Sequence, residues 1–375
     1  AAAAGEHTER KTRHRTRHRP AGKTRHQGDP TCPGTFNIGG VGEVALVPTG
    51  WLDEGMEQVY VRNASLLEPH MDARAYFASE CTAGTYDNRQ YLALNLLRKT
   101  IRYTVDLSGT DCGCNVAFYL VSMHQNSEVS ECKDYYCDAN SVCGIPCAEI
   151  DIMEANMYAW HSTLHTQFDH GGMGGGLGGG DGWNGPRDWS VKEFGPNGKC
   201  IDTSNPFDVE ISFPVGKNKI LTAMEVALSQ AGKDCGLALR LSEYAGMADL
   251  SKALGEGMTP VVSYWSSDKM LWMDGEGVDK KGPCHVDKPK LCAPTAKMYN
   301  FTVFDLAEAP AGEGGEDEEG NAVAEGGAGH EDEADFQEPT AKPIAEAKCA
   351  GQLDISGVDG DIHIIPTGWG LPDFK

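Results

Sequence analysis

The sequence predicts an all-β protein built as a sandwich of two sheets. Short runs of β-branched and aromatic residues recur along the chain, glycine-rich turns separate them, and few stretches have the period of a helix. The most helix-like stretch, residues 219–228, is equally a candidate strand. The clearest expected strands are residues 100–107, 116–123, 207–213, 261–265 and 297–304.

Composition narrows the class of protein before any motif is considered. The chain has 375 residues, a formal net charge of −23 and 13 cysteines. The negative charge argues against a nucleic acid partner, and no apolar run approaches the roughly 20 residues that span a membrane. So many cysteines favour an oxidising compartment, and we expect a secreted protein in the extracellular space or cell wall. Two glycosylation sequons, at Asn63 and Asn300, agree with secretion.

The two ends of the chain differ in composition from the body at residues 31–306. Residues 1–30 are basic and repeat Thr-Arg-His, which predicts a disordered tail; polyanion or metal binding by this tail is the alternative. Residues 307–348 are rich in glutamate, alanine and glycine, a composition that cannot bury a core. We therefore expect an acidic linker there.

An internal repeat relates the two ends of the sequence. The segment CPGTFNIGGV, which begins at Cys32, leads to VPTGW ending at Trp51, and the segment CAGQLDISGV, which begins at Cys349, leads to IPTGW ending at Trp369. We expect residues 349–375 to start a second unit of a tandem-repeat precursor made of monomeric units. Twelve cysteines then remain in this unit, enough for six disulfides. The alternative is two similar strands within one sandwich.

Three carboxylates, Glu149, Asp151 and Glu154, stand close together on a stretch with the composition of a strand. Because strand side chains alternate between faces, Glu149 and Asp151 point the same way, and Glu154 needs either a bulge or the end of the strand to join them. Converging carboxylates raise one another's pKa, and a protonated carboxyl about 5 Å from an ionised one is the pair that a retaining glycosidase uses. The alternative is a solvated sheet face that happens to be acidic.

Four blocks of residues carry a family resemblance. They are IRYTVDLS at 101–108 with CGCN at 112–115 and FYLVSM at 118–123, YCDAN at 136–140, CAEIDIMEAN at 147–156, and VSYW at 262–265 with MLWMD at 270–274. In this order they resemble glycoside hydrolase family 7, the eukaryotic cellulases, over about residues 92–306. The first 90 residues match that family poorly.

The resemblance implies a concanavalin-like jelly-roll sandwich whose long loops form a substrate cleft. It also implies a cellulase that hydrolyses β-1,4-glucan with retention and without a cofactor or metal. Glu149 would be the nucleophile and Glu154 the general acid/base. Asp151 would hydrogen-bond Glu149 and help to orient it, and Glu154 would need a raised pKa while Glu149 stays ionised.

The same resemblance implies a set of substrate-binding side chains. Polar residues would meet sugar hydroxyls, and tryptophans would stack on the apolar faces of sugar rings. These expected residues are His165, Tyr119, Asn115, Asp138, Asn140, Trp265 and Trp272.

Several departures from the family pattern shape the expected activity. Met153 replaces the usual tryptophan inside the carboxylate motif, and Asn140 replaces a glutamine. The segments after Asn140 and between Trp265 and Trp272 are short, which favours an open cleft and endo-cleavage over processive release from chain ends. Residues 171–182 hold nine glycines and are expected to form a flexible surface loop near the cleft. The alternative function is a non-catalytic carbohydrate-binding or cell-wall structural protein on the same fold.

Overall fold

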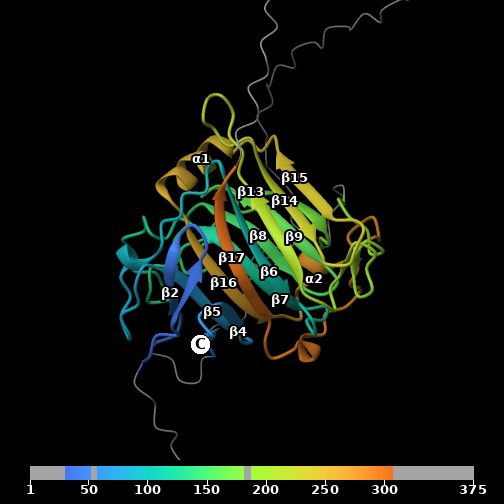
Figure 1. Ribbon diagram of the computed structural model, residues 1–375, viewed down its shortest axis with the longest axis horizontal. Coiled ribbons are helices and arrows are strands. Elements are labelled where there is room, and N and C mark those ends of the chain that lie inside the picture. Colours follow the sequence, from blue (N-terminus) through green and yellow to red (C-terminus); the bar gives the residue numbers. More distant parts are fainter. Residues whose placement is uncertain (1–29, 52–56, 181–186, 307–375) are drawn as a thin grey trace, which may run out of the picture. The chain divides into compact units, whose positions relative to one another are not determined.

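Two antiparallel β-sheets make up the body of the computed structural model, which describes residues 30–51, 57–180 and 187–306 (Figure 1). The predicted all-β sandwich is therefore confirmed. The expected linker at 307–348 and the expected second unit at 349–375 lie outside the described residues, as does the basic tail up to residue 29. No helix among the described residues is long and apolar enough to cross a membrane.

The first sheet has eight strands in the order β1-β2-β5-β16-β7-β8-β9-β10. Their bounds are β1 Thr35–Ile38, β2 Gly42–Pro48, β5 Ala73–Ala78, β7 Cys114–Val121, β8 Glu149–Ala155, β9 Trp160–His165, β10 Met173–Leu177 and β16 Thr259–Ser266. The strand β8, which carries the three carboxylates, lies inside this sheet between β7 and β9.

The second sheet has seven strands in the order β15-β14-β13-β6-β17-β4-β3. Their bounds are β3 Val59–Arg62, β4 Leu66–Pro69, β6 Lys99–Asp106, β13 Phe207–Ser212, β14 Ala223–Ser229, β15 Leu237–Ser242 and β17 Lys297–Asp305. The remaining elements are the short parallel pair β11 Phe194–Gly195 and β12 Ile201–Asp202, the helices α1 Met247–Glu256 and α2 Leu271–Asp274, and the 3-10 turns η1 Asn88–Gln90 and η2 Pro289–Leu291.

The core lies between the two sheets and is rich in aromatic rings. Tyr103 of β6 and Phe301 of β17 stack with ring centroids 5.3 Å apart, and Phe118 of β7 meets Tyr103 edge-on at 5.0 Å. Burial along β13 alternates residue by residue, as expected for a strand with one face in the core. Every residue of β7 is buried, because both faces of that inner strand are covered. These contacts hold the sheet that carries the carboxylates against its partner.

All five expected strands are present, as β6, β7, β13, β16 and β17. The ambiguous stretch at 219–228 takes the strand alternative from Ala223 onward. The ten-residue helix α1 was not predicted, although Leu250, Ala253 and Leu254 give it a buried stripe at helical spacing. The prediction of a loop over residues 171–182 is wrong in its first half, because Met173–Leu177 forms the edge strand β10 beside β9.

The expectation of six disulfides from twelve cysteines is confirmed. The pairs are Cys32–Cys81, Cys112–Cys284, Cys114–Cys292, Cys132–Cys143, Cys137–Cys147 and Cys200–Cys235. Two of these bridges close the loop that leads into β8, and two more tie the start of β7 to residues 284 and 292. The start of β7 and the loop before the carboxylate strand β8 are thus covalently braced.

Candidate active site

A β-bulge in β8 brings the three carboxylates to one face, which is one of the two ways that the sequence left open. The pairing of β8 with both neighbours shifts register between Asp151 and Glu154. The two residues of the bulge, Ile152 and Met153, both lie in the core. The extra residue reverses the alternation, so Glu154 returns to the face of Glu149 and Asp151. The motif therefore has the geometry of a converging acidic site.

Met153, the departure within the motif, is accommodated by the core. Its side chain is fully buried, and the hydroxyl of Tyr103 donates a hydrogen bond to its sulfur at 3.6 Å. A flexible thioether fills irregular space well. The Met153 side chain therefore fills the core on the face of β8 opposite the carboxylates.

Glu154 is bound by one amide from the neighbouring strand. The Nδ2 of Asn115 on β7 donates a hydrogen bond to its Oε1 at 2.9 Å. Burial raises the pKa of Glu154 to about 8, and the charge of Asp151 adds to the rise, while the Asn115 hydrogen bond and the nearby His165 oppose it. A carboxyl that holds its proton near neutral pH is suited to act as a general acid.

Glu149 is almost completely enclosed, with 7% of its surface exposed. Burial raises its pKa well above the ordinary value, and the charges of Asp151, Asp138 and Glu154 add to the rise. The backbone N–H of Ala139 donates to its Oε2 at 3.0 Å and acts in the opposite direction. Burial and the neighbouring negative charges thus disfavour the ionised Glu149 that a nucleophile requires.

Asp151 makes its strong contact with His165 of β9. The Nε2 of His165 lies 3.1 Å from its Oδ2. Burial alone would lower the pKa of His165, but the hydrogen bond and charge of Asp151 outweigh it and raise the pKa. We expected Asp151 to hydrogen-bond Glu149; among the described residues its carboxylate pairs with His165 instead, and it affects Glu149 through its charge.

The other expected polar residues divide into buried and exposed positions. Tyr119 and Asp138 are buried beside the carboxylates; the hydroxyl of Tyr119 lies 3.0 Å from that of Tyr136, and Asp138 Oδ1 accepts from the N–H of Val142. Burial raises the pKa of Asp138. Asn140 is exposed and has no hydrogen bond among the described residues. The structure therefore does not bring Asn140 into the cluster.

The two expected tryptophans come from different elements, β16 and α2. Trp265 of β16 is the cross-strand partner of Asn115, which contacts Glu154. Trp272 lies on α2, and both indoles are partly exposed and pack against a small cluster that includes Met270 and Met273.

Sequence reasoning missed two basic side chains on this sheet. His161 is the cross-strand partner of Glu154, and burial lowers its pKa to about 4. Arg74 of β5 lies over the ring of Tyr136, with its guanidinium carbon 3.8 Å from the ring centroid. The spacing of His161 four residues before His165 on one strand was a usable signal, whereas Arg74 falls in the part of the chain with little resemblance to the family.

Glycines within β10 and just before it allow this part of the chain to lie directly against the histidines of β9. A Cβ on Gly172 would come within 2.5 Å of His165 Nδ1, and one on Gly174 within 2.7 Å of His161 Cε1. Real Cβ contacts of that length do not occur, so side chains at these positions would displace the rings. The glycine-rich composition thus reflects close packing beside the site.

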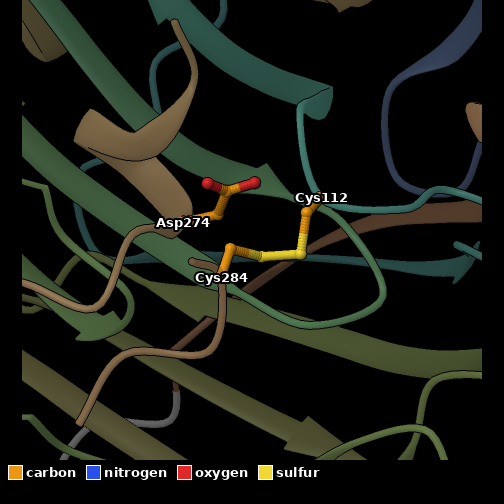
Figure 2. Close-up of side chains that lie close together, drawn as sticks. All are labelled: Cys112, Asp274 and Cys284. Carbon is orange, nitrogen blue, oxygen red and sulfur yellow. A yellow bond between two sulfur atoms is a disulfide. The ribbon is translucent and has the colours of Figure 1, made fainter. Parts of the chain in front are cut away.

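Two cysteines and an acid also lie close together, but they do not form a metal centre. The sulfurs of Cys112 and Cys284 and a carboxylate oxygen of Asp274 lie within 4.8 Å of one another. Figure 2 shows the yellow bond that joins the two sulfurs as a disulfide. Disulfide sulfurs are not the thiolates that bind metal ions, so this cluster is a structural brace.

The fold and the site together define a class: a concanavalin-like jelly-roll sandwich with an acidic site on an inner strand. Endoglucanase EG-1 of Hypocrea jecorina is 30% identical over 237 residues, which cover 52% of this chain and 48% of the relative. Endo-beta-1,4-glucanase celB of Emericella nidulans is 24% identical over 321 residues, which cover 68% of this chain and 73% of the relative. The chain spans about half the length of the first relative, and no family model matches it.

Solved structures of the same fold agree with these relatives. A GH7 family cellobiohydrolase from Daphnia pulex superposes with a TM-score of 0.55 at 15% identity, covering 74% of this chain and 97% of that structure. A mutant of the endocellulase Cel7B of Humicola insolens gives a TM-score of 0.53 at 18% identity, covering 73% and 97%. The predicted resemblance is confirmed: the chain is similar in sequence to endoglucanases and shares the fold of a GH7 family structure.

Proposed function

We propose that this protein is a retaining glycoside hydrolase that cleaves β-1,4-glucan internally. The observation that carries the proposal is the bulge in β8, which gathers Glu149, Asp151 and Glu154 on one face. A solvated acidic surface has no reason to be buried, whereas Glu149 and Asp151 are buried, and the half-buried Glu154 has a pKa of about 8. Two curated relatives are named as endoglucanases, which supports endo-cleavage.

The proposed reaction is a double displacement. Glu154 donates its proton to the glycosidic oxygen while the Glu149 carboxylate attacks the anomeric carbon, and the bond to the leaving sugar breaks. Glu154, now ionised, then takes a proton from water as the water oxygen attacks the anomeric carbon and releases Glu149. Each step inverts the anomeric centre, so the product retains the configuration of the substrate.

The proposed substrate contacts combine stacking with hydrogen bonds. Trp265 and Trp272 would support sugar rings, and His165 and Tyr119 would meet hydroxyls beside the anomeric centre. Asp138 would influence the site through its charge on Glu149.

We further propose that the enzyme is secreted as one unit of a tandem-repeat precursor. The six disulfides support folding in an oxidising compartment. The repeated segment at 349–375 and the acidic composition of 307–348 support further units in the same chain. Mass spectrometry of the protein purified from its native source would test this: a mature species that ends near residue 348 supports cleavage between units, and peptides that span the linker show that it is retained.

The test of function is sugar release by the wild type beside Glu149→Gln. The substrates are carboxymethyl-cellulose, barley β-glucan and crystalline cellulose, and the readout is new reducing ends. We expect turnover by the wild type and a loss of at least about 10³-fold in the variant, because the nucleophile is removed. Glu43→Gln, an exposed change on β2, is the matched control. A wild type that binds glucan without turnover on any substrate would instead support a binding protein.

A further inference from the structure

A buried carboxyl outside the catalytic trio connects three segments of the site. Asp274 ends α2 and is fully buried. Its Oδ2 accepts hydrogen bonds from the backbone N–H of Gly113 and from Nδ2 of Asn156, both at 2.8 Å. Gly113 immediately precedes β7, and Asn156 immediately follows β8. One oxygen atom therefore joins the start of one catalytic strand to the end of the next.

Asn156 extends this connection. Its Nδ2 also donates to the carbonyl of Cys114 at 3.1 Å, and its Oδ1 accepts from the N–H groups of Tyr158 and Ala159. Both ends of the side chain are thus fully used, which fixes its orientation. The backbone on either side of Gly113 is held from two directions, by Asp274 through the N–H of Gly113 and by Asn156 through the carbonyl of Cys114.

The next residue along β7 is the amide that binds the proposed acid/base. Asn115 follows Cys114 directly, is fully buried, and donates to Glu154 Oε1 at 2.9 Å. The Cys112–Cys284 and Cys114–Cys292 disulfides hold this end of β7, and Figure 2 shows Asp274 beside the first of them. The carbonyl of Asp274 also accepts from the N–H of Cys284 at 3.0 Å. Asp274 thus belongs to the set of hydrogen bonds and disulfides that hold the backbone next to Asn115.

We propose that Asp274 is a positioning residue that acts through Gly113 and Asn156 to set the hydrogen bond from Asn115 to Glu154. A buried aspartate used only as a cap would need one donor, whereas this one receives two donors from two strands. Its other oxygen has no hydrogen-bond partner among the residues that the structure describes. An unpaired buried polar atom is costly to retain, which favours a role beyond packing. The inference rests on the proposed role of Glu154.

The pKa of Glu154 reports this role directly, because the Asn115 hydrogen bond favours the ionised carboxylate. The other groups that face Glu154 are Glu149 and Asp151 on its own strand and His161 and His165 on β9. None of these is bonded to Asp274 in the described part of the chain. A substitution at Asp274 should therefore alter the pKa of Glu154 through Asn115. The pKa shifts caused by substitutions at Asp274 and at Asn115 should then not add.

The experiment is a titration of 13C-labelled glutamate carboxyls by NMR, with the Glu154 signal assigned from Glu154→Gln. Loss of a charge-assisted hydrogen bond should raise the pKa of Glu154 by about one to two pH units in Asn115→Ala. We expect Asp274→Ala to raise it similarly, and the double variant to raise it no further. Asp274→Asn, which keeps an acceptor oxygen for both donors, should leave it near the wild-type value.

The proposal is overturned if Asp274→Ala leaves the Glu154 titration unchanged while Asn115→Ala moves it, or if the two shifts add. Should Asp274→Ala fail to fold by circular dichroism, Asp274→Ser, whose side chain is too short for both contacts, takes its place with the same outcomes. The titration needs no turnover, so an inactive wild type would reject the proposed function alone. In an active enzyme the basic limb of kcat/KM should move with the Glu154 pKa.

Discussion

At the scale of single residues, Glu154 determines the expected response to pH. Its pKa of about 8 arises because burial and the charge of Asp151 outweigh the Asn115 hydrogen bond. The general acid must be protonated and the nucleophile ionised, so the active form exists only between their titrations. Burial also raises the pKa of Glu149, and this moves the acid limit of the active pH range upward.

The dependence of kcat/KM on pH should accordingly be bell-shaped. We expect the basic limb near pH 8, from deprotonation of Glu154, and an acid limb above the ordinary glutamate pKa of about 4.3, from ionisation of Glu149. Initial rates on a soluble β-glucan at low concentration measure both limbs. A plateau that extends well beyond pH 9 would assign the general acid to another group.

Asp151→Asn should shift this profile to lower pH. The Asp151 charge raises the pKa of both Glu149 and Glu154, so its removal lowers both. The loss of its pairing with His165 opposes the shift at Glu154, but that contribution is smaller. Activity should also fall, because His165 loses its partner. A shift of the basic limb to higher pH would show that the His165 effect dominates.

At the scale of elements, the strand β8 was predictable because two simple rules apply to it. The alternation of strand side chains placed Glu149 and Asp151 together, and the parity of Glu154 required a bulge or the end of the strand, of which the structure contains the bulge. The pairing of Asp151 with His165 was not predictable, because it depends on which residues of β9 lie opposite β8. Sequence spacing carries no information on that register.

The strand β10 shows a different limit of sequence reasoning. Its glycines suggested a loop, since glycine is unfavourable within strands. The structure uses them because the backbone of β10 lies against His161 and His165. The lack of side chains at these glycines therefore indicated a close approach between two strands. A strand could be distinguished from a loop only once the neighbouring strand β9 was known.

Gly174→Ala tests this explanation. The added Cβ would meet His161 Cε1 at 2.7 Å and Thr163 Oγ1 at 3.1 Å, so the buried ring beside Glu154 must move. We expect a loss of about 1–3 kcal/mol in the free energy of unfolding and reduced kcat. Chemical denaturation and rates on soluble glucan measure the two effects.

The matched control is Gly255→Ala in the helix α1. A Cβ there meets only Leu97 Cδ1, at 3.6 Å, which is ordinary contact. Alanine is favoured over glycine in helices, so stability should rise by roughly 0.5–1 kcal/mol with activity unchanged. Equal effects of the two substitutions would contradict the close packing of β10 against β9.

At the scale of the whole molecule, cysteine parity gave the number of disulfides but not their pairing. Twelve cysteines in a secreted unit predict six bridges, and many pairings satisfy that count. The structure joins residues as distant as Cys114 and Cys292, because β7 and the segment before β17 meet in space. Such contacts follow from the order of strands in the sheets, which the sequence alone did not provide.

Stability should be greatest in mildly acidic solution. Glu149, Glu154, Asp138 and Asp274 have raised pKa values in the fold, chiefly through burial. Their contribution is fully present below the ordinary carboxyl pKa and is lost as pH rises through their folded values, about 8 for Glu154 and about 7 for Asp274. Thermal melts should therefore show a Tm that falls between pH 5 and pH 8.

Glu154→Gln should reduce the fall of Tm between pH 5 and pH 8, since the amide does not titrate. Glu43→Gln, an exposed change on β2, should leave the decline unaltered. A Tm that rises steadily from pH 5 to pH 8 in the wild type would mean that the site carboxyls are ionised in the folded protein.

The most direct test of the central claim is to trap the glycosyl-enzyme. A 2-deoxy-2-fluoro-β-cellobioside with a good leaving group slows the second displacement more than the first, so a retaining enzyme accumulates the covalent ester. Peptide mapping by mass spectrometry should find the added disaccharide on Glu149, in wild type and not in Glu149→Gln. An adduct on another residue, or none in a protein that hydrolyses glucan, would contradict the account.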